Sequence, residues 1–370
     1  MTIRELTSSV STRMEELILQ EAHKWTLSRP FGDELSCAVD YARRIADLAA
    51  GDLPAAIRLA MHLTAAWGLR LMPSDLPANR YFAEVRNNGH LFAGLHDMDP
   101  NEPNSSSFLA TPTEGGFRFN GTSGQLHLDS RVHYVPVCGR IVHPGEQPEF
   151  AFAVIPVTAR GVVLSRDSDA MNANEAEGMN FGRGHVQLQD VFVQADETVL
   201  FASSESEILD NFALLHRLNV SAIYLGIARS ALACACESAK ASHVPQWGLP
   251  LSRFPGTQFL VADAAILLET CESQLSTYAD RLNRLFGEQG GDRRLAADTG
   301  LITMEYAVDT TRKILHLAMK ITGISSILSG HPLANLYGLL RSPMFDLGQT
   351  DSAHNRDRIA KAVMEATSVS

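Results

Sequence analysis

Residues that could carry chemistry are scattered along this chain, and no motif assigns a reaction by itself. The sequence has no G-x-x-x-x-G-K-[ST], no C-x-x-C and no H-E-x-x-H, and no G-x-G-x-x-G follows an expected strand. Cys234 and Cys236 point in different directions on an expected helix, so we interpret them as small packing residues. Glu175 and Glu177 lack a histidine or aspartate at metal-ligand spacing. No metal site is therefore predicted.

Other candidate residues have an equally plain structural interpretation. The glycines of GRGHV (182–186) are a weak phosphate-cradle signal near a strand start, and a simple bend explains them better. Asp351 precedes Ser352-Ala353, which is typical of a helix N-cap. His127 and His354 are isolated, and most isolated histidines are surface or satisfied core residues. Function must therefore be inferred from the order of the segments that would position these residues.

The composition is that of a globular protein. Its 370 residues are 45% hydrophobic and 20% charged, enough for roughly two or three domain-sized units. The net charge of −11 argues against a nucleic acid or an anionic membrane as partner. We expect no transmembrane helix and no signal peptide, because no apolar run reaches about 18 residues and the N-terminus lacks an apolar core. Five sparse cysteines suit reduced thiols, so we predict a cytoplasmic protein.

Hydrophobic periodicity divides the chain into three parts. Helical patterns open it at 2–26, 35–50 and 53–68, with Asp52 placed to cap the third. Between about 90 and 200, alternating or β-branched runs bounded by Gly, Pro, Asn and Asp predict an antiparallel sheet or barrel. Four long helical patterns follow, at about 204–241, 255–286, 294–322 and 351–367.

We therefore predict an α+β protein. Its parts are an N-terminal helical domain (1–88), a middle antiparallel β domain (89–202) and a C-terminal four-helix bundle (203–370). The stretch 214–263 is a helical hairpin whose turn carries Trp247-Gly248, between Pro245 and the pair Pro250 and Pro255.

This layout resembles the acyl-CoA dehydrogenase superfamily, and five segments are similar to its motifs in the same order. They are GGFRFNGTSG (115–124), VQLQDVFVQADETVL (186–200), RLNVSAIYLGIARSALACACESAK (217–240), FPGTQFLVAD (254–263) and TGISSILSGHPLANLYGLLR (322–341). The resemblance extends over about residues 35–367. No single motif is decisive, and the resemblance depends on the five segments occurring in the same order as in the family.

The resemblance implies a flavin. The family binds FAD in a cleft between the β domain and the C-terminal helices, partly formed by a neighbouring subunit, as a large apolar cofactor requires. It therefore implies FAD, with FMN as the alternative, and a homodimer or homotetramer. Flavin would lie between the strand at 91–96, the hairpin at 121–128 and the bundle. The implied cofactor-binding residues are Leu95, His127, Trp247, Gly248, Gln258, Lys320, Gly323, Gln349 and Thr350.

The chain departs from the family where charge is expected. The family's R-x-x-F-G places an arginine against the FAD pyrophosphate, but Val244 stands three residues before Trp247-Gly248 here. Valine cannot replace a bidentate guanidinium, and His243 or Arg253 would have to compensate. Further on, paired glycines become Gly323-Ile324 and the R-x-x-R-D charges are lost. An apo protein therefore stays an alternative.

The family's catalytic carboxylate is also displaced. Aligning its y-E-G-T on GQT (348–350) puts Leu347 or Gly348 at the base position, and neither can accept a proton. Asp346 and Asp351 flank that position and would reach it only with a shift of register. His354 or His127 could supply the hydrogen-bond donor that a base-free site needs.

The two-component flavin monooxygenases, which take reduced flavin from a partner reductase, are the branch that GISSILSGHPLANLY resembles most. We therefore favour a monooxygenase or oxidase acting on an organic or thioester-carried substrate. An FAD-dependent acyl-CoA or acyl-carrier dehydrogenase stays open. So does a catalytically silent partner to a second superfamily subunit, since the short N-terminal part and the lost charges also fit it.

Overall fold

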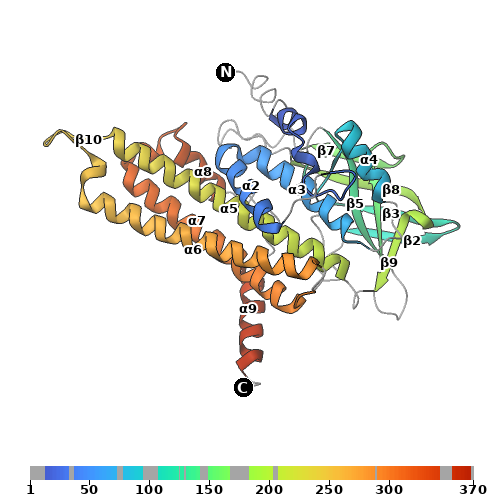
Figure 1. Ribbon diagram of the computed structural model, residues 1–370. Coiled ribbons are helices and arrows are strands. Elements are labelled where there is room, and N and C mark those ends of the chain that lie inside the picture. Colours follow the sequence, from blue (N-terminus) through green and yellow to red (C-terminus); the bar gives the residue numbers. More distant parts are fainter. Residues whose placement is uncertain are drawn as a thin grey trace. The chain divides into compact units, whose positions relative to one another are not determined.

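The computed structural model describes most of the chain, and its elements are labelled in Figure 1. The described residues are 13–32, 37–72, 78–94, 107–124, 126–128, 131–141, 149–166, 183–202, 207–287, 290–341 and 352–367. The chain forms two compact units. Unit 1 comprises Met1–Ser36, Ile57–Ala170 and Asn180–His216, and unit 2 comprises Cys37–Ala56, Met171–Met179 and Arg217–Ser370.

The described N-terminal helices are more numerous than predicted, and the first of them ends earlier. A helix at 13–19 is followed by η1 (Ala22–Lys24), and the left-handed φ of 62° at Glu21 separates the two, so the helix predicted to reach residue 26 ends earlier. The predicted third helix is α3 (Leu53–Arg70), capped as expected by Asp52, whose Oδ1 accepts from the Ala55 N–H at 3.0 Å. A further helix, α4 (Ala78–Asn88), was not predicted.

Unit 1 is built on one sheet. Its strands are β1 (Leu91–Phe92), β2 (Phe108–Thr113), β3 (Gly116–Thr122), β4 (Leu126–His127), β5 (Val132–Ile141), β6 (Glu149–Pro156), β7 (Val162–Arg166), β8 (Arg183–Gln194) and, after η2 (Ala195–Glu197), β9 (Thr198–Ala202). Their order is β4-β8-β3-β2-β5-β6-β9, with β1 on β5 and β7 on β8. Most pairs are antiparallel as predicted. The sheet is nevertheless mixed, because β1 and β2 each pair with β5 in parallel.

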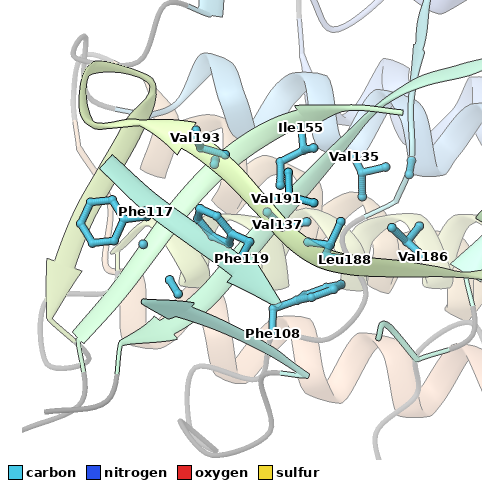
Figure 2. Packing of buried hydrophobic residues seen from close by; sticks show 14 of the residues in the cluster. Phe108, Phe117, Phe119, Val135, Val137, Ile155, Val186, Leu188, Val191 and Val193 are labelled. Atoms are coloured by element: carbon cyan, nitrogen blue, oxygen red, sulfur yellow. The ribbon is translucent and has the colours of Figure 1, made fainter. Parts of the chain in front are cut away.

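The two sides of this sheet bury different residues. On β6, Ala151, Ala153 and Ile155 belong to a cluster enclosed by the strands, which Figure 2 shows with Phe117, Phe119 and the valines around them. The alternate residues Phe150 and Phe152 belong to a second cluster, shared with α3, α4 and the start of α5. The period of two along β6 therefore gives each core its own residues.

Unit 2 contains the long helices predicted for the C-terminal part. They are α5 (Glu207–Ala241, from Arg217 onward), α6 (Pro255–Phe286), α7 (Arg293–Thr322) and α9 (Ser352–Thr367). The other elements are α2 (Ala38–Gly51), the hairpin strands β10 (His243–Val244) and β11 (Leu249–Pro250), η4 (Leu251–Arg253), η5 (Gly323–Ile327) and α8 (Pro332–Arg341). The α+β class and the helical C-terminal part are confirmed. In Figure 1, however, α9 leaves α7 at a steep angle.

The centre of unit 2 is α5, which is buried on nearly every side from Arg217 to Ala228. It is the one helix in the described ranges long and apolar enough to cross a membrane, but 72% of its most apolar window is buried inside the protein. One of its close neighbours is α2. A Cβ on Gly226 would lie 2.4 Å from the carbonyl oxygen of Ala46 and 2.6 Å from the Cβ of Ala49. Gly226 therefore sets the distance between α2 and α5.

Buried histidines hold the N-terminal part of unit 1. His62 donates from Nε2 to the His23 carbonyl (2.9 Å), and its Nδ1 accepts from the Phe92 N–H (3.0 Å). Burial lowers the pKa of His62 to about 3 and that of His23 to about 4. Both rings are therefore neutral in the folded protein near neutral pH, which this hydrogen bonding of His62 requires.

Gly226→Ala is predicted to destabilise the protein by about 1–3 kcal/mol, because the new methyl meets backbone that cannot rotate away. The matched control is Gly338→Ala in α8, where a Cβ meets nothing within 4 Å; it should leave stability unchanged or raise it by up to about 1 kcal/mol. Urea or thermal unfolding of both variants measures the difference. Equal effects would show that α2 and α5 can separate freely.

Stability is also predicted to fall as pH drops from 6.5 towards 4. The unfolded chain takes up protons on His23 and His62 near pH 6.5, whereas the folded chain resists them down to about pH 4 and 3. Each histidine contributes a slope of up to about 1.4 kcal/mol per pH unit. Urea unfolding at several pH values should give a shallower slope for His62→Gln. His243→Gln, at an exposed position on β10, should keep the wild-type slope, and a wild-type slope in both variants would contradict the assignment.

Candidate functional site

Several predicted cofactor residues meet at one end of the α6–α7 pair. The two helices are antiparallel, and their register is fixed by Gln274 Nε2, which donates to Thr303 Oγ1 at 3.2 Å. Gln258 lies 16 residues before Gln274 on α6, and Met319 lies 16 residues after Thr303 on α7. Because the helices run antiparallel from the Gln274–Thr303 contact, Gln258 lies level with Met319 and Lys320. We call this the distal end: the hairpin 243–250, η4, the first turn of α6, the last turn of α7, and η5.

A tight turn presents Trp247 at the distal end. β10 and β11 pair antiparallel, and the N–H groups of Trp247 and Gly248 both donate to the Val244 carbonyl, at 3.1 and 2.9 Å. Gly248 has a φ of 62°, a conformation that favours glycine. The Trp247 side chain is 63% exposed, and its ring centroid lies 5.2 Å from that of Phe254, with planes 28° apart. The hairpin therefore offers a braced aromatic surface.

The polar groups of the distal end suit an anion. Lys320 is exposed in the last turn of α7, and Arg253 is exposed in η4 beside the hairpin. Gln258 is exposed and donates from Nε2 to the Ser252 carbonyl at 3.2 Å, which ties the first turn of α6 to η4. Val244, at the position of the family arginine, is half-buried on β10. Arg253 is therefore the guanidinium that this segment does carry.

His354 lies elsewhere on unit 2. The next two residues of α9 bind the middle of α7: Asn355 Nδ2 donates to Glu305 Oε1 at 3.1 Å, and Arg356 pairs with Asp309 at 2.8 Å. Asp309 is 11 residues before Lys320, which is about 16 Å along α7. The Nε2 of His354 is buried without a partner among the described residues. A single chain therefore does not bring His354 to the distal end.

Most of the remaining predicted site residues lie outside the part of the chain that the structure describes. Leu95, Asp346, Gln349, Thr350 and Asp351 lie outside the described residues. The backbone of His127 forms part of β4, paired with Arg183 of β8 in unit 1, and its side chain also lies outside the description. Gly323 ends α7 at the distal end with a φ of 76°. Five of the predicted residues are thus brought together: Trp247, Gly248, Gln258, Lys320 and Gly323.

Sequence reasoning missed two features. The first is Phe254, which stacks on Trp247 from seven residues further along the chain. It lies directly before Pro255, the first residue of α6, and an aromatic residue at that position was the sequence signal that could have predicted the stack. In unit 1, His90 stacks on His133 with ring centroids 3.7 Å apart, and His90 Nδ1 lies 3.4 Å from Tyr134 Oη. Burial and the neighbouring His133 lower the pKa of His90. In the parts of the chain that the structure describes, no group of three or more His, Cys, Asp or Glu could hold a metal ion.

Comparison with known proteins gives a family for the C-terminal part. Residues 218–335 match the family described as acyl-CoA dehydrogenase, C-terminal domain. This stretch contains the hairpin, α6, α7 and η5, and so includes the whole distal end. Among curated proteins, none matches this chain significantly.

Solved structures share the fold over nearly the whole chain. Butyryl-CoA dehydrogenase from Megasphaera elsdenii gives a TM-score of 0.79 at 17% identity, covering 95% of this chain and 89% of that one. Methanesulfinate monooxygenase MsuC from Pseudomonas fluorescens gives 0.78 at 15%, covering 96% and 90%. KijD3, solved with FMN and dTDP-3-amino-2,3,6-trideoxy-4-keto-3-methyl-D-glucose, gives 0.77 at 16%, covering 95% and 87%.

Identities this low establish the fold alone, but they agree with the matched domain and with the order of helices and sheet. Residues 218–335 therefore match the acyl-CoA dehydrogenase C-terminal domain, and the chain as a whole has the fold of these solved structures.

Proposed function

We propose that this protein is a flavin-dependent oxidoreductase of the monooxygenase or oxidase type, acting on an organic or thioester-carried substrate. The observation that carries the proposal is the distal end, where Trp247, braced by Phe254, lies at the same end of the bundle as Lys320 and Arg253. A flat aromatic ring system bearing phosphate needs this combination of a stacking surface and cations.

The distal end fits a flavin in part. Trp247 would stack on its ring system, while Lys320 and Arg253 would neutralise its phosphate. When bound, flavin would supply the redox chemistry, and the protein's task would be to orient it and exclude water. FAD remains the expected form. FMN is the alternative, because FMN has no pyrophosphate and Val244 offers no guanidinium at the family position that would bind one.

A second subunit is part of this proposal. Trp247, Gly248, Gln258 and Lys320 are all exposed in the single chain, so water would screen their interactions with a ligand. A cleft on a second copy would exclude that water and would also reconcile the distal end with a His354 about 16 Å or more away along its own chain. In the monooxygenase type, a reductase would be a further partner that delivers reduced flavin.

The lack of a carboxylate at the family's base position favours the monooxygenase or oxidase type. The alignment puts Leu347 or Gly348 at that position, and neither accepts a proton. His354, with its unpartnered Nε2, can donate or accept one hydrogen bond without acting as a strong base. Methanesulfinate monooxygenase has the same fold, which is compatible with this type.

The dehydrogenase alternative needs Asp346 or Asp351 to act as base after a change of register, and both lie outside the described residues. A second alternative, the catalytically silent subunit, is favoured by Val244, whose half-buried side chain has replaced the phosphate-binding arginine. It predicts that the protein binds no flavin at all, and flavin binding therefore comes first among the tests.

Trp247→Ala is predicted to weaken flavin binding roughly 3–10-fold, because an aromatic stacking contact contributes about 0.5–1.5 kcal/mol. Equilibrium dialysis against FAD and FMN, oxidised and reduced, measures the affinity. Phe192→Ala removes a similarly exposed aromatic from β8 of unit 1 and should leave binding unchanged. Wild-type protein that binds none of these flavins would favour the silent subunit, and equal binding by the Trp247 variant would remove Trp247 from the site.

The reaction type is predicted from the response of the flavin-loaded protein to oxygen and to acyl thioesters. Reduced flavin supplied with oxygen should be reoxidised faster with the protein than without it. Acyl-CoA thioesters added without oxygen should leave oxidised flavin coloured, because no base removes the α-proton. Anaerobic bleaching by a thioester would instead establish the dehydrogenase. In that case Asp346→Asn, tested beside Asp351→Asn, would show which carboxylate had taken over.

A further inference from the structure

A bulge at the start of β5 interrupts its pairing with β1. Leu91 lies opposite Val132, whereas the next residue, Phe92, lies opposite Tyr134. His133 is therefore an extra residue on β5, inserted into a pair whose strands run parallel. Bulges are rare in parallel pairs, and a bulge points a side chain in a direction that a regular strand would not give it.

The extra residue presents its ring to His90, which directly precedes β1. The two imidazoles are stacked, with centroids 3.7 Å apart and planes 7° apart, and both side chains are partly buried. The Nδ1 of His133 donates to the Arg131 carbonyl at 2.5 Å, so this nitrogen carries a hydrogen. Two positive charges at the separation of the stacked rings would repel strongly, and the stack therefore accommodates at most one.

The Nδ1 of His90 lies between two alternative partners. The Tyr134 hydroxyl oxygen is 3.4 Å away, and the Glu84 Oε2 is 3.6 Å away. Asn88 holds the carboxylate in place, because its Nδ2 donates to the same Oε2 at 2.6 Å. A deprotonated Nδ1 can accept from the hydroxyl, whereas a protonated Nδ1 is attracted to the carboxylate. The protonation state of His90 therefore selects its partner.

We propose that His90, His133, Tyr134 and Glu84 form a pH-sensitive latch on β1, which opens when His90 takes up a proton, turns its Nδ1 from the Tyr134 hydroxyl to the Glu84 carboxylate and leaves the stack with His133. We call these four residues the β1 latch. The latch lies within unit 1 and does not depend on flavin binding.

The latch acts on the backbone through Arg131. The carbonyl oxygen of Arg131 accepts from the His133 ring and also from the Leu91 N–H, at 3.3 Å. β1 is two residues long, and just beyond it the Ala93 N–H donates to the Tyr134 carbonyl at 2.8 Å. Opening of the stack removes the contact that holds the His133 ring in this position. It therefore loosens the longer of these two backbone bonds, at the first residue of β1.

The other charges around the β1 latch are paired with one another. Arg131 pairs with Glu15 of the helix at 13–19. On α4, Arg80 pairs with Glu197 of η2 at 2.5 Å and also donates to the Tyr81 hydroxyl at 2.5 Å. Among the residues that the structure describes, Glu84 is therefore the carboxylate that a protonated His90 meets.

The direction of the pH response follows from the surroundings of His90. Burial and the stacked His133 lower the pKa of His90, and Glu84 opposes them in part. Leaving the stack relieves both effects and keeps the carboxylate, so the open latch binds the proton more tightly than the closed one. Burial raises the pKa of Tyr134, whose hydroxyl therefore stays protonated. The latch is thus closed at neutral pH and opens as the pH falls below 6.5.

The test is the pH dependence of amide hydrogen exchange in the full-length protein. Mass spectrometry compares a peptide spanning His90–Ala93 with a peptide from β6, after correction for the intrinsic effect of pH on exchange. From about pH 7.5 to 5.0, protection of the β1 peptide should fall roughly tenfold relative to that of β6, as for a pKa difference of about one unit between open and closed states. Equal changes in the two peptides would overturn the proposal, because they would report unfolding of unit 1 as a whole.

Two variants should shift the midpoint of this transition in opposite directions. Tyr134→Phe removes the hydroxyl that favours the neutral ring, so the latch should open at a higher pH. Glu84→Gln removes the carboxylate that receives the protonated ring, so the latch should open at a lower pH. The control His316→Gln, at an exposed position on α7, should keep the wild-type midpoint. A midpoint that neither latch variant changes, or that both move in the same direction, would rule out the latch.

Discussion

The burial of α5 is the constraint on which the helical unit depends. A helix buried on nearly every side must be enclosed by other helices, and small residues set how closely they approach. Gly226 brings the α2 backbone against α5, and Arg229, one turn further on, pairs with Asp47 of α2 (2.7 Å) and Glu272 of α6 (2.6 Å). On another side, the Thr311 hydroxyl donates to the Tyr224 carbonyl at 2.9 Å. α5 thereby fixes α2, α6 and α7.

This arrangement explains why candidate site residues can lie far from the centre of the unit and still be held. The distal end is carried by two long helices whose register is set by side-chain contacts, including the hydrogen bond from Arg281 to Thr299 and the packing of Tyr278 against Gly300. A Cβ on Gly300 would lie 2.6 Å from the Tyr278 hydroxyl oxygen. The hairpin at 243–250 has few contacts of its own, and its position depends on the α5 and α6 termini that it connects.

The long helices could be predicted from the sequence because each obeys local rules. The patterns at 255–286 and 294–322 match Pro255–Phe286 and Arg293–Thr322, since proline and an aspartate cap begin the two helices and glycines follow them. Local rules could not predict α4 or the parallel pairing of β2 with β5, because both depend on contacts between distant segments. Only the family resemblance, and no local rule, predicted that Trp247 and Lys320 belong to one site. No local rule predicted that Trp247 stacks on Phe254.

The two faces of α6 differ in burial. Its inward residues hold the register with α7 and thus the distal end, while its outward residues Phe259 and Ile266 are mostly exposed. Phe259 and Ile266 each leave apolar surface in water, which forgoes about 25 cal/mol of stabilisation per Å². Gln258, directly before Phe259, ties the first turn of α6 to η4 and so to the Trp247 hairpin. A second copy that covered the distal end, as the proposed function requires, would order these elements before any ligand arrives and so lower the entropic cost of binding one there.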